Sequence, residues 1–147
     1  MRIQTGHVGL NVTDVTRSRD FYRRLLELDV LGEGTQEGRR FAFLGRDGAP
    51  VLTLWQQSTG SFSSTEPGLH HLSFQASDMG EVRRVAAVAR ELGAMFRYDD
   101  VVPHGEGAPS GGVFFTDPDG IRLEVFATAG AEGLAAPTAG APTCGLF

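Results

Sequence analysis

An internal repeat constrains the fold of this chain more than any other feature of the sequence. The first copy reads His7-Val-Gly-Leu-Asn-Val-Thr-Asp14, and the second reads His71-Leu-Ser-Phe-Gln-Ala-Ser-Asp78. Each copy is a short alternating segment that predicts a strand, followed by an aspartate that can cap a helix. Such self-similarity indicates that one structural unit occurs twice. It also places two histidines, which are potential metal ligands, at equivalent points of the two units.

Both aspartates precede a stripe of residues at helical spacing, which predicts one helix in each unit. The first stripe comprises Val15, Ser18, Phe21, Tyr22, Leu25 and Leu26. In the second unit Glu81 completes a capping box with Asp78, and Gly93 ends the helix. The second stripe comprises Val82, Val85, Ala86, Ala89 and Leu92.

Strand-like runs follow each predicted helix, so the fold class is α+β with two βαβββ modules. In the first module they lie around residues 30–31, at 39–44 and at 51–55, with a hairpin turn at Gly45-Arg-Asp-Gly48. In the second they lie at 95–102, 113–115 and 121–126, with a turn at Asp117-Pro-Asp-Gly120. We therefore predict a single domain at residues 1–127, with modules at 5–57 and 69–127 and a polar linker at 58–68. Residues 128–147 are rich in Ala, Gly and Pro, which predicts a flexible tail.

Composition narrows the classes of protein to which the chain can belong. The 147 residues carry a net charge of -5, which argues against nucleic acid and acidic membranes as partners. There is no apolar signal segment and no apolar run long enough to span a bilayer, so we expect a cytoplasmic protein. The single cysteine, Cys144, excludes an intramolecular disulfide, and we expect it to be an exposed, incidental residue.

Strand alternation predicts which side chains face away from the helices. His7 and His71 fall on that face together with Glu124 from the last predicted strand. Two imidazoles and one carboxylate on one face of an octahedron bind divalent iron, manganese or nickel and leave positions open for substrate. Taken singly, each histidine could instead be a hydrogen-bonded structural residue, and Glu124 could be a solvated carboxylate on a strand face. The other residues predicted to line this face are Asn11, Thr53, Trp55, Gln57, Gln75, Arg122 and Phe126.

These motifs resemble the vicinal oxygen chelate superfamily, which includes glyoxalase I, extradiol dioxygenases, epimerases, fosfomycin-resistance transferases and bleomycin-binding proteins. The similarity rests on the two repeat copies, on Phe21-Tyr22 and on Asp117-Pro-Asp-Gly-Ile-Arg-Leu-Glu124, and it covers about residues 5–127. It implies an open, cup-shaped mixed sheet around a metal ion, commonly completed across a homodimer. Carried over, the metal ligands are His7, His71 and Glu124. The adjacent His70 breaks the repeat register and is expected on the helix side.

The chain departs from individual branches of this superfamily. The resemblance implies a glutamate ligand of glyoxalase I where Thr53 stands, and a hydroxyl cannot replace a carboxylate for nickel or zinc. A glutamine of the epimerases has no clear match. Gln57 lies four residues beyond the matching position, and the side chain of Gln56 is expected on the opposite face of the strand. Gly9 stands where the fosfomycin transferases have a threonine, and Phe114 stands where the extradiol dioxygenases have a tyrosine. His104 lies slightly upstream of their histidine, so it is either an acid/base group or a solvated loop residue.

Three functions from different classes follow from these residues. The first is an iron(II) extradiol-type dioxygenase for a small aromatic or vicinal-oxygen substrate, with manganese, nickel or zinc as other possible ions. The second is proton transfer in a glyoxalase or epimerase that uses the same metal site. The third is a metal-free protein that binds small drug molecules. For the enzyme we expect apolar walls from Trp55, Phe115 and Phe126, and polar contacts from Asn11, Gln75 and Arg122.

Overall fold

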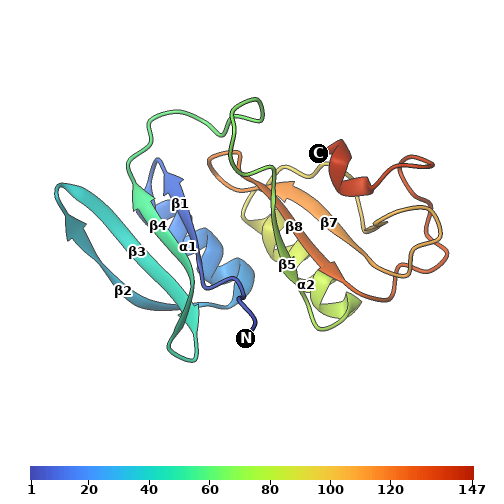
Figure 1. The fold of residues 1–147 in the computed structure, drawn as a ribbon, viewed down its shortest axis with the longest axis horizontal. Coiled ribbons are helices and arrows are strands. Elements are labelled where there is room, and N and C mark those ends of the chain that lie inside the picture. Colours follow the sequence, from blue (N-terminus) through green and yellow to red (C-terminus); the bar gives the residue numbers. More distant parts are fainter. The chain divides into compact units, whose positions relative to one another are not determined.

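The computed structural model describes all 147 residues, which form two units, Met1–Ser61 and Phe62–Phe147 (Figure 1). Each unit contains one α-helix and one four-stranded sheet. The first unit comprises β1 (Val8–Val12), α1 (Val15–Leu26), β2 (Asp29–Gln36), β3 (Arg39–Arg46) and β4 (Ala49–Gln56). The second comprises β5 (Leu72–Gln75), α2 (Met79–Glu91), β6 (Val102–Pro103), β7 (Gly111–Thr116), β8 (Arg122–Ala127) and the short 3-10 helix η1 (Thr143–Leu146). The two predicted βαβββ modules are confirmed.

The two sheets have the same topology, as the sequence repeat requires. The strand order is β1-β4-β3-β2 in the first unit and β5-β8-β7-β6 in the second. The first strand of each unit pairs in parallel with the last, and the remaining pairs are antiparallel. In the second unit this pairing sets Ser73 directly opposite Glu124. Residues near the start and the end of each module therefore lie side by side.

Both helices begin at the predicted aspartates. The Asp14 side chain accepts a hydrogen bond from the backbone N–H of Arg17 at 3.1 Å, and Asp78 accepts one from Glu81 at 2.9 Å. These bonds satisfy amide groups that have no partner within the helix. The predicted apolar stripes form the buried faces, and Tyr22 and Leu25 are completely buried.

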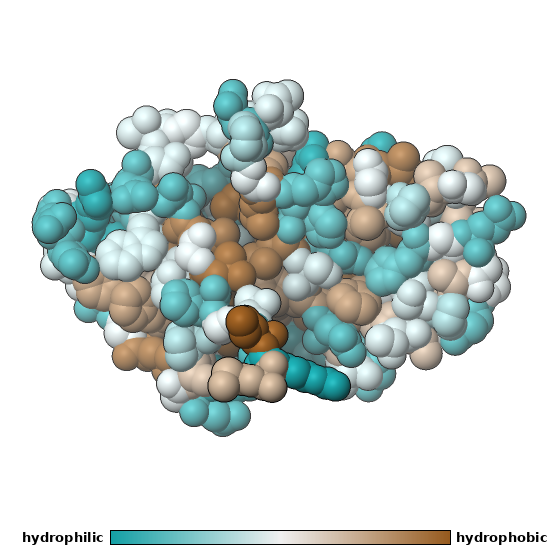
Figure 2. All heavy atoms as spheres, in the orientation of Figure 1, coloured by the Kyte–Doolittle hydropathy of each residue, from teal (hydrophilic) through white to brown (hydrophobic).

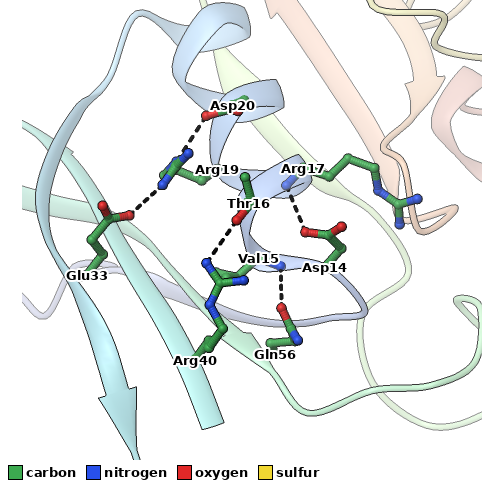
Figure 3. Close-up of polar contacts among 9 residues, drawn as sticks. All are labelled: Asp14, Val15, Thr16, Arg17, Arg19, Asp20, Glu33, Arg40 and Gln56. Carbon is green, nitrogen blue, oxygen red and sulfur yellow. Dashed lines mark hydrogen bonds and ion pairs between the residues drawn. The ribbon is translucent and has the colours of Figure 1, made fainter.

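Further polar contacts fix α1 against its own sheet (Figure 3). The Gln56 side-chain oxygen accepts a hydrogen bond from the Val15 amide at 2.9 Å, and Arg40 donates to the Thr16 hydroxyl at 2.9 Å. Arg19 reaches Glu33 on β2 at 2.7 Å. The Gln56 side chain therefore binds the N-terminus of the helix. This agrees with strand alternation, which predicted that Gln56 points away from the site face.

Two hairpin turns shape the sheet of the first unit. Asp47 and Gly48, which join β3 to β4, have φ values of 52° and 77°. Positive φ at both central residues is typical of a type I′ turn, as predicted from the Asp-Gly pair. Glu37 and Gly38 form an equivalent turn between β2 and β3, with φ values of 51° and 78°. The second predicted strand is therefore longer than the segment around residues 30–31, because this turn lets it pair along β3 up to Gln36.

The strand predicted at residues 95–102 is not formed as one element. Met95 accepts a hydrogen bond from the Thr116 amide at 3.0 Å, and Arg97 donates to the Phe114 carbonyl at 2.8 Å. Phe96 makes only an isolated bridge to Phe115. The chain then bends at residues 98–100, where two aspartates favour a turn, and pairing resumes only in β6.

Residues 128–147 belong to the second unit and pack against it, so the prediction of a flexible tail is wrong. Thr143 is 2 % exposed, and its hydroxyl donates to the Pro103 carbonyl at 2.5 Å. Ala131 is buried, and its amide donates to the Pro109 carbonyl at 2.9 Å. A few specific hydrogen bonds and small buried side chains hold the segment, which composition alone does not reveal.

Hydrophilic residues are spread over the surface of both units on the face drawn in Figure 2, interrupted by apolar side chains. Among the large apolar residues, Met95 is 76 % exposed. Neither helix is long and apolar enough to cross a membrane.

Candidate metal and substrate site

The second unit has a buried carboxylate on its central strand β8. Glu124 is 4 % exposed, and the Ser73 hydroxyl on β5 donates to its Oε2 atom at 2.8 Å. His71 immediately precedes β5, and its Nε2 atom lies 3.4 Å from the same oxygen. The parallel pairing of β5 with β8 produces this arrangement, because it aligns the start of the module with its last strand. Two of the three predicted metal ligands, His71 and Glu124, are therefore brought together.

A second imidazole contacts the other oxygen of this carboxylate. His104 lies in the loop between β6 and β7, and its Nε2 atom forms a hydrogen bond with Oε1 of Glu124. Its Nδ1 atom lies 2.8 Å from the Ser110 hydroxyl, and its amide donates to the Ser110 carbonyl at 2.9 Å. A proton on Nε2 satisfies both side-chain contacts, since Nδ1 then accepts from the serine. His104 is thus held against Glu124 and is only partly exposed to solvent.

The electrostatic state of Glu124 follows from these neighbours. Burial by itself would raise the pKa of the carboxyl group, but hydrogen bonds from His104 and Ser73 outweigh it, and the nearby imidazoles act in the same direction. The net result is a lowered pKa for Glu124. The site therefore holds a buried, ionised carboxylate at neutral pH.

The position of His70 differs from the expectation. His70 is exposed, and its Nδ1 atom lies 2.8 Å from Nδ1 of His71. The prediction that it faces the helix fails because β5 begins at Leu72, so strand alternation does not extend back to residue 70. One imidazole must donate this hydrogen bond and the other must accept it. The contact with His70 holds the ring of His71, whose Nε2 atom faces the carboxylate.

Aromatic side chains flank the site, but one differs from the prediction. Phe126 packs beside the His104 ring, with centroids 5.1 Å apart. Phe115, expected as a wall, is completely buried and stacks on Phe96 on the core face opposite Leu123. Its neighbour Phe114 pairs with Glu124 across β7 and β8 and so shares the face of the carboxylate. The prediction for Phe115 is wrong, because the short apolar run of β7 has no period that shows which side chains face the core.

In the first unit the residues predicted to line the site lie on and next to β1 and β4. Asn11 accepts a hydrogen bond from the Gln57 side chain at 2.7 Å. Thr53 is 7 % exposed and lies opposite Gly9, and Trp55 packs against two phenylalanines. Those two, Phe41 and Phe43 on β3, were not identified from the sequence, although their alternation along the strand could have indicated them. His7 directly precedes β1 and is exposed.

The donor atoms in the second unit fit a metal ion in part. Adjacent ligands at right angles, with bonds of about 2.1 Å, lie about 3.0 Å apart. The 3.4 Å between His71 Nε2 and Glu124 Oε2 is close to that spacing, and the carboxylate supplies the required negative charge. No group of three or more His, Cys, Asp or Glu side chains in the structure forms a complete metal site. The second unit thus offers two neighbouring candidate ligands, His71 and Glu124. The remaining predicted substrate contacts, Gln75 and Arg122, lie on β5 and β8.

Known proteins resemble this chain in sequence and in fold. Catechol-2,3-dioxygenase of Bacillus subtilis (strain 168) is 27% identical over 125 residues, which are 83% of this chain and 40% of the relative. The chain therefore spans less than half the length of that enzyme.

Among solved structures, a glyoxylase/bleomycin resistance protein/dioxygenase domain from Frankia sp. EAN1pec superimposes with a TM-score of 0.73 at 27% identity. The superposition covers 87% of this chain and 99% of that one. A variant of the fosfomycin resistance protein FosX from Listeria monocytogenes, complexed with Mn(II) and a dihydroxypropylphosphonic acid, gives a TM-score of 0.67 at 18% identity. It covers 88% of this chain and 95% of that one, and at this identity it shows the fold alone.

The sequence pattern of one protein family covers most of the chain, from residue 4 to residue 125, and therefore includes both modules and all three predicted ligands. The chain belongs to the Glyoxalase/Bleomycin resistance protein/Dioxygenase superfamily.

Proposed function

We propose that this chain is a metal-dependent dioxygenase of the extradiol type, which uses iron(II) and acts on a small aromatic substrate with two neighbouring oxygen atoms. One observation carries the proposal: an ionised, buried Glu124 lies beside the Nε2 atom of His71. A buried charge of this kind is costly unless a cation or strong hydrogen bonds stabilise it. The similarity to a catechol-2,3-dioxygenase supports the choice of substrate class.

We further propose His7, His71 and Glu124 as the metal ligands. The ligands are contributed by both modules, and we propose that a homodimer completes the site. A divalent ion bound there acts as a Lewis acid and a template for the two vicinal oxygens of the substrate. Three protein ligands leave positions open for small molecules, and Thr53, where the superfamily can have a glutamate, adds no charge.

Residues around the ligands orient them and shape the substrate site. Ser73 and His104 each hold one oxygen of Glu124, and such outer contacts fix the direction in which a ligating carboxylate presents its lone pairs. We propose that Phe126 and Trp55 provide apolar contacts for the substrate ring. Polar contacts to the substrate are proposed for Asn11, Gln75 and Arg122.

Proton transfer at a vicinal-oxygen substrate is the second candidate function. His104 favours it, because an imidazole beside the carboxylate is a potential base. Both of its ring nitrogens are hydrogen-bonded, however, to Glu124 and to Ser110. An imidazole whose two nitrogens are occupied is poorly placed to take a proton from a substrate, so ring cleavage is the preferred function.

The test is to measure metal content and ring cleavage with the same preparations. Untagged protein is purified anaerobically without chelator and analysed by elemental mass spectrometry, then given a panel of catechols under dioxygen. We expect iron near stoichiometry, and a product that has gained both atoms of isotopically labelled dioxygen. Glu124→Gln should lose both the bound iron and the ring-cleavage product. Glu66→Gln, at an exposed position, serves as the matched control.

The other outcomes point to the alternative functions. Nickel or zinc in the protein, with solvent deuterium incorporated into a carbonyl substrate, would favour proton transfer. If no metal is present and none is taken up on adding iron(II), the chain is a small-molecule binding protein.

A further inference from the structure

The segment Thr143–Phe147 is fixed next to the loop that carries His104. The Thr143 amide donates to the His104 carbonyl at 2.9 Å, and its hydroxyl donates to the Pro103 carbonyl at 2.5 Å. At the other end of the segment, Arg97 Nε donates to the Leu146 carbonyl at 3.1 Å. The segment is therefore held at both ends by hydrogen bonds to elements of the second unit.

This docking places an aromatic ring against the site. The Phe147 ring lies over His71, with centroids 6.2 Å apart and planes inclined by 33°. It also meets Phe114 edge-on at 5.6 Å, and the Arg122 guanidinium lies 5.4 Å from its centroid. The Phe147 side chain is thus contacted by Phe114 on β7, Arg122 on β8 and His71 just before β5. Phe147 is only half-buried, so part of its ring is open to solvent.

We infer that Phe147 is a specificity-determining residue that forms one wall of the substrate site and favours planar aromatic ligands. The inference rests on the proposed function, because it assumes that His71 and Glu124 hold the ion that binds the substrate oxygens. A ligand held through two oxygens next to His71 would bring its remaining atoms near that imidazole, beside which the Phe147 ring packs. Aromatic pairs gain energy beyond the area they bury, whereas an aliphatic ligand gains little from this geometry.

The surroundings of the second imidazole support an aromatic preference. Phe126 packs beside His104 with centroids 5.1 Å apart, and Phe147 packs beside His71 with centroids 6.2 Å apart. Each imidazole that contacts Glu124 therefore has a phenyl ring beside it.

The first measurement tests the position of Phe147 without any metal. Proton–nitrogen correlation spectra of the metal-free protein resolve its four histidine side chains. Because a phenyl ring shifts the resonances of protons above its face, Phe147→Ala should move the ring protons of His71 and leave those of His7 unchanged. Leu146→Ala, in the same segment, is the control. Unchanged His71 resonances in Phe147→Ala would overturn the inference.

The second measurement tests the preference itself. Protein loaded with manganese(II) under argon is titrated with nitrocatechol, and separately with oxalate, which chelates through two vicinal oxygens but has no ring. Phe147→Ala should weaken nitrocatechol binding about three- to tenfold and leave oxalate binding unchanged. Thr143→Val, which removes the anchoring hydroxyl, should act in the same direction. Equal effects on both ligands, or none on either, would refute the inference. Failure of the wild-type protein to bind the ion would instead count against the proposed function, and the histidine spectra would still decide where Phe147 lies.

Discussion

Replacing Asp117 with alanine should destabilise the second unit strongly, because this side chain organises the turn that leads into β8. Asp117 is 5 % exposed, and its Oδ1 atom accepts hydrogen bonds from the amides of Asp119 at 2.8 Å and Ile121 at 2.9 Å. The turn also contains the backbone pair between the Asp117 amide and the Ile121 carbonyl. Glu124 lies three residues after Ile121, so its position depends on this turn.

The size of the effect can be worked out from these contacts. A hydrogen bond to a charged group contributes about 1.5–3 kcal/mol, so two contribute about 3–6 kcal/mol. Removal of a buried carboxylate also removes its desolvation cost, which offsets part of the loss. The amides left behind belong to the buried residues Asp119 and Ile121, so water does not easily replace the lost acceptor. We therefore expect Asp117→Ala to lower the free energy of unfolding by about 2–4 kcal/mol.

Urea denaturation followed by far-ultraviolet circular dichroism measures this difference. With a slope of about 2 kcal/mol/M, the midpoint should fall by about 1–2 M urea. Trp55 lies in the first unit, so its fluorescence provides an internal reference that the substitution should affect less. Asp117→Asn is the matched control, because its side-chain oxygen can still accept both bonds. Equal midpoints for the alanine variant and the wild-type protein would refute this account of the turn.

The remaining predictions concern the site and its supporting backbone. His71→Ala should abolish binding of a divalent ion, whereas His70→Ala should weaken it about 10–100-fold and His70→Asn should restore it, as measured by titration calorimetry. Gly112→Ala should lower the free energy of unfolding by about 1–3 kcal/mol in a thermal melt, because the added Cβ would lie 2.3 Å from a backbone oxygen of β8. Gly105→Ala is the control and should be neutral, because no atom lies within 4 Å of the added Cβ. Cys144→Ser should leave the metal content unchanged by elemental analysis, and a loss of metal would show that the thiol takes part in the site.

The elements with strong local signals could be predicted from the sequence. Capping aspartates and apolar stripes located both helices, and the Asp-Gly pair located a hairpin turn. The alternation on β8 separated Leu123 and Val125, which lie in the core, from Glu124, which contacts Ser73 and His71. These features depend on neighbours in the sequence, and local patterns therefore identify them.

Features that depend on contacts between distant segments could not be predicted in this way. His104 is held by Ser110 and Glu124, so a loop that looks mobile from its composition is fixed by its partners. Residues 143–147 are held by backbone groups of Pro103 and His104, which leave no trace in composition. The expectation that Phe115 forms a wall of the site is wrong, because a continuous apolar run has no period that assigns its faces.

The parallel pairing of the first and last strands also has a consequence for folding kinetics. His71 and Glu124 meet only after a loop of about 50 residues has closed, at an entropic cost of roughly 3.5 kcal/mol before any constant term. Such long-range pairing is slow to form and is expected to be completed late, after the helix and hairpins are in place. Interactions formed after the transition state act mainly on the unfolding rate. An ion bound between these two side chains should therefore slow unfolding of the second unit and leave its folding rate almost unchanged.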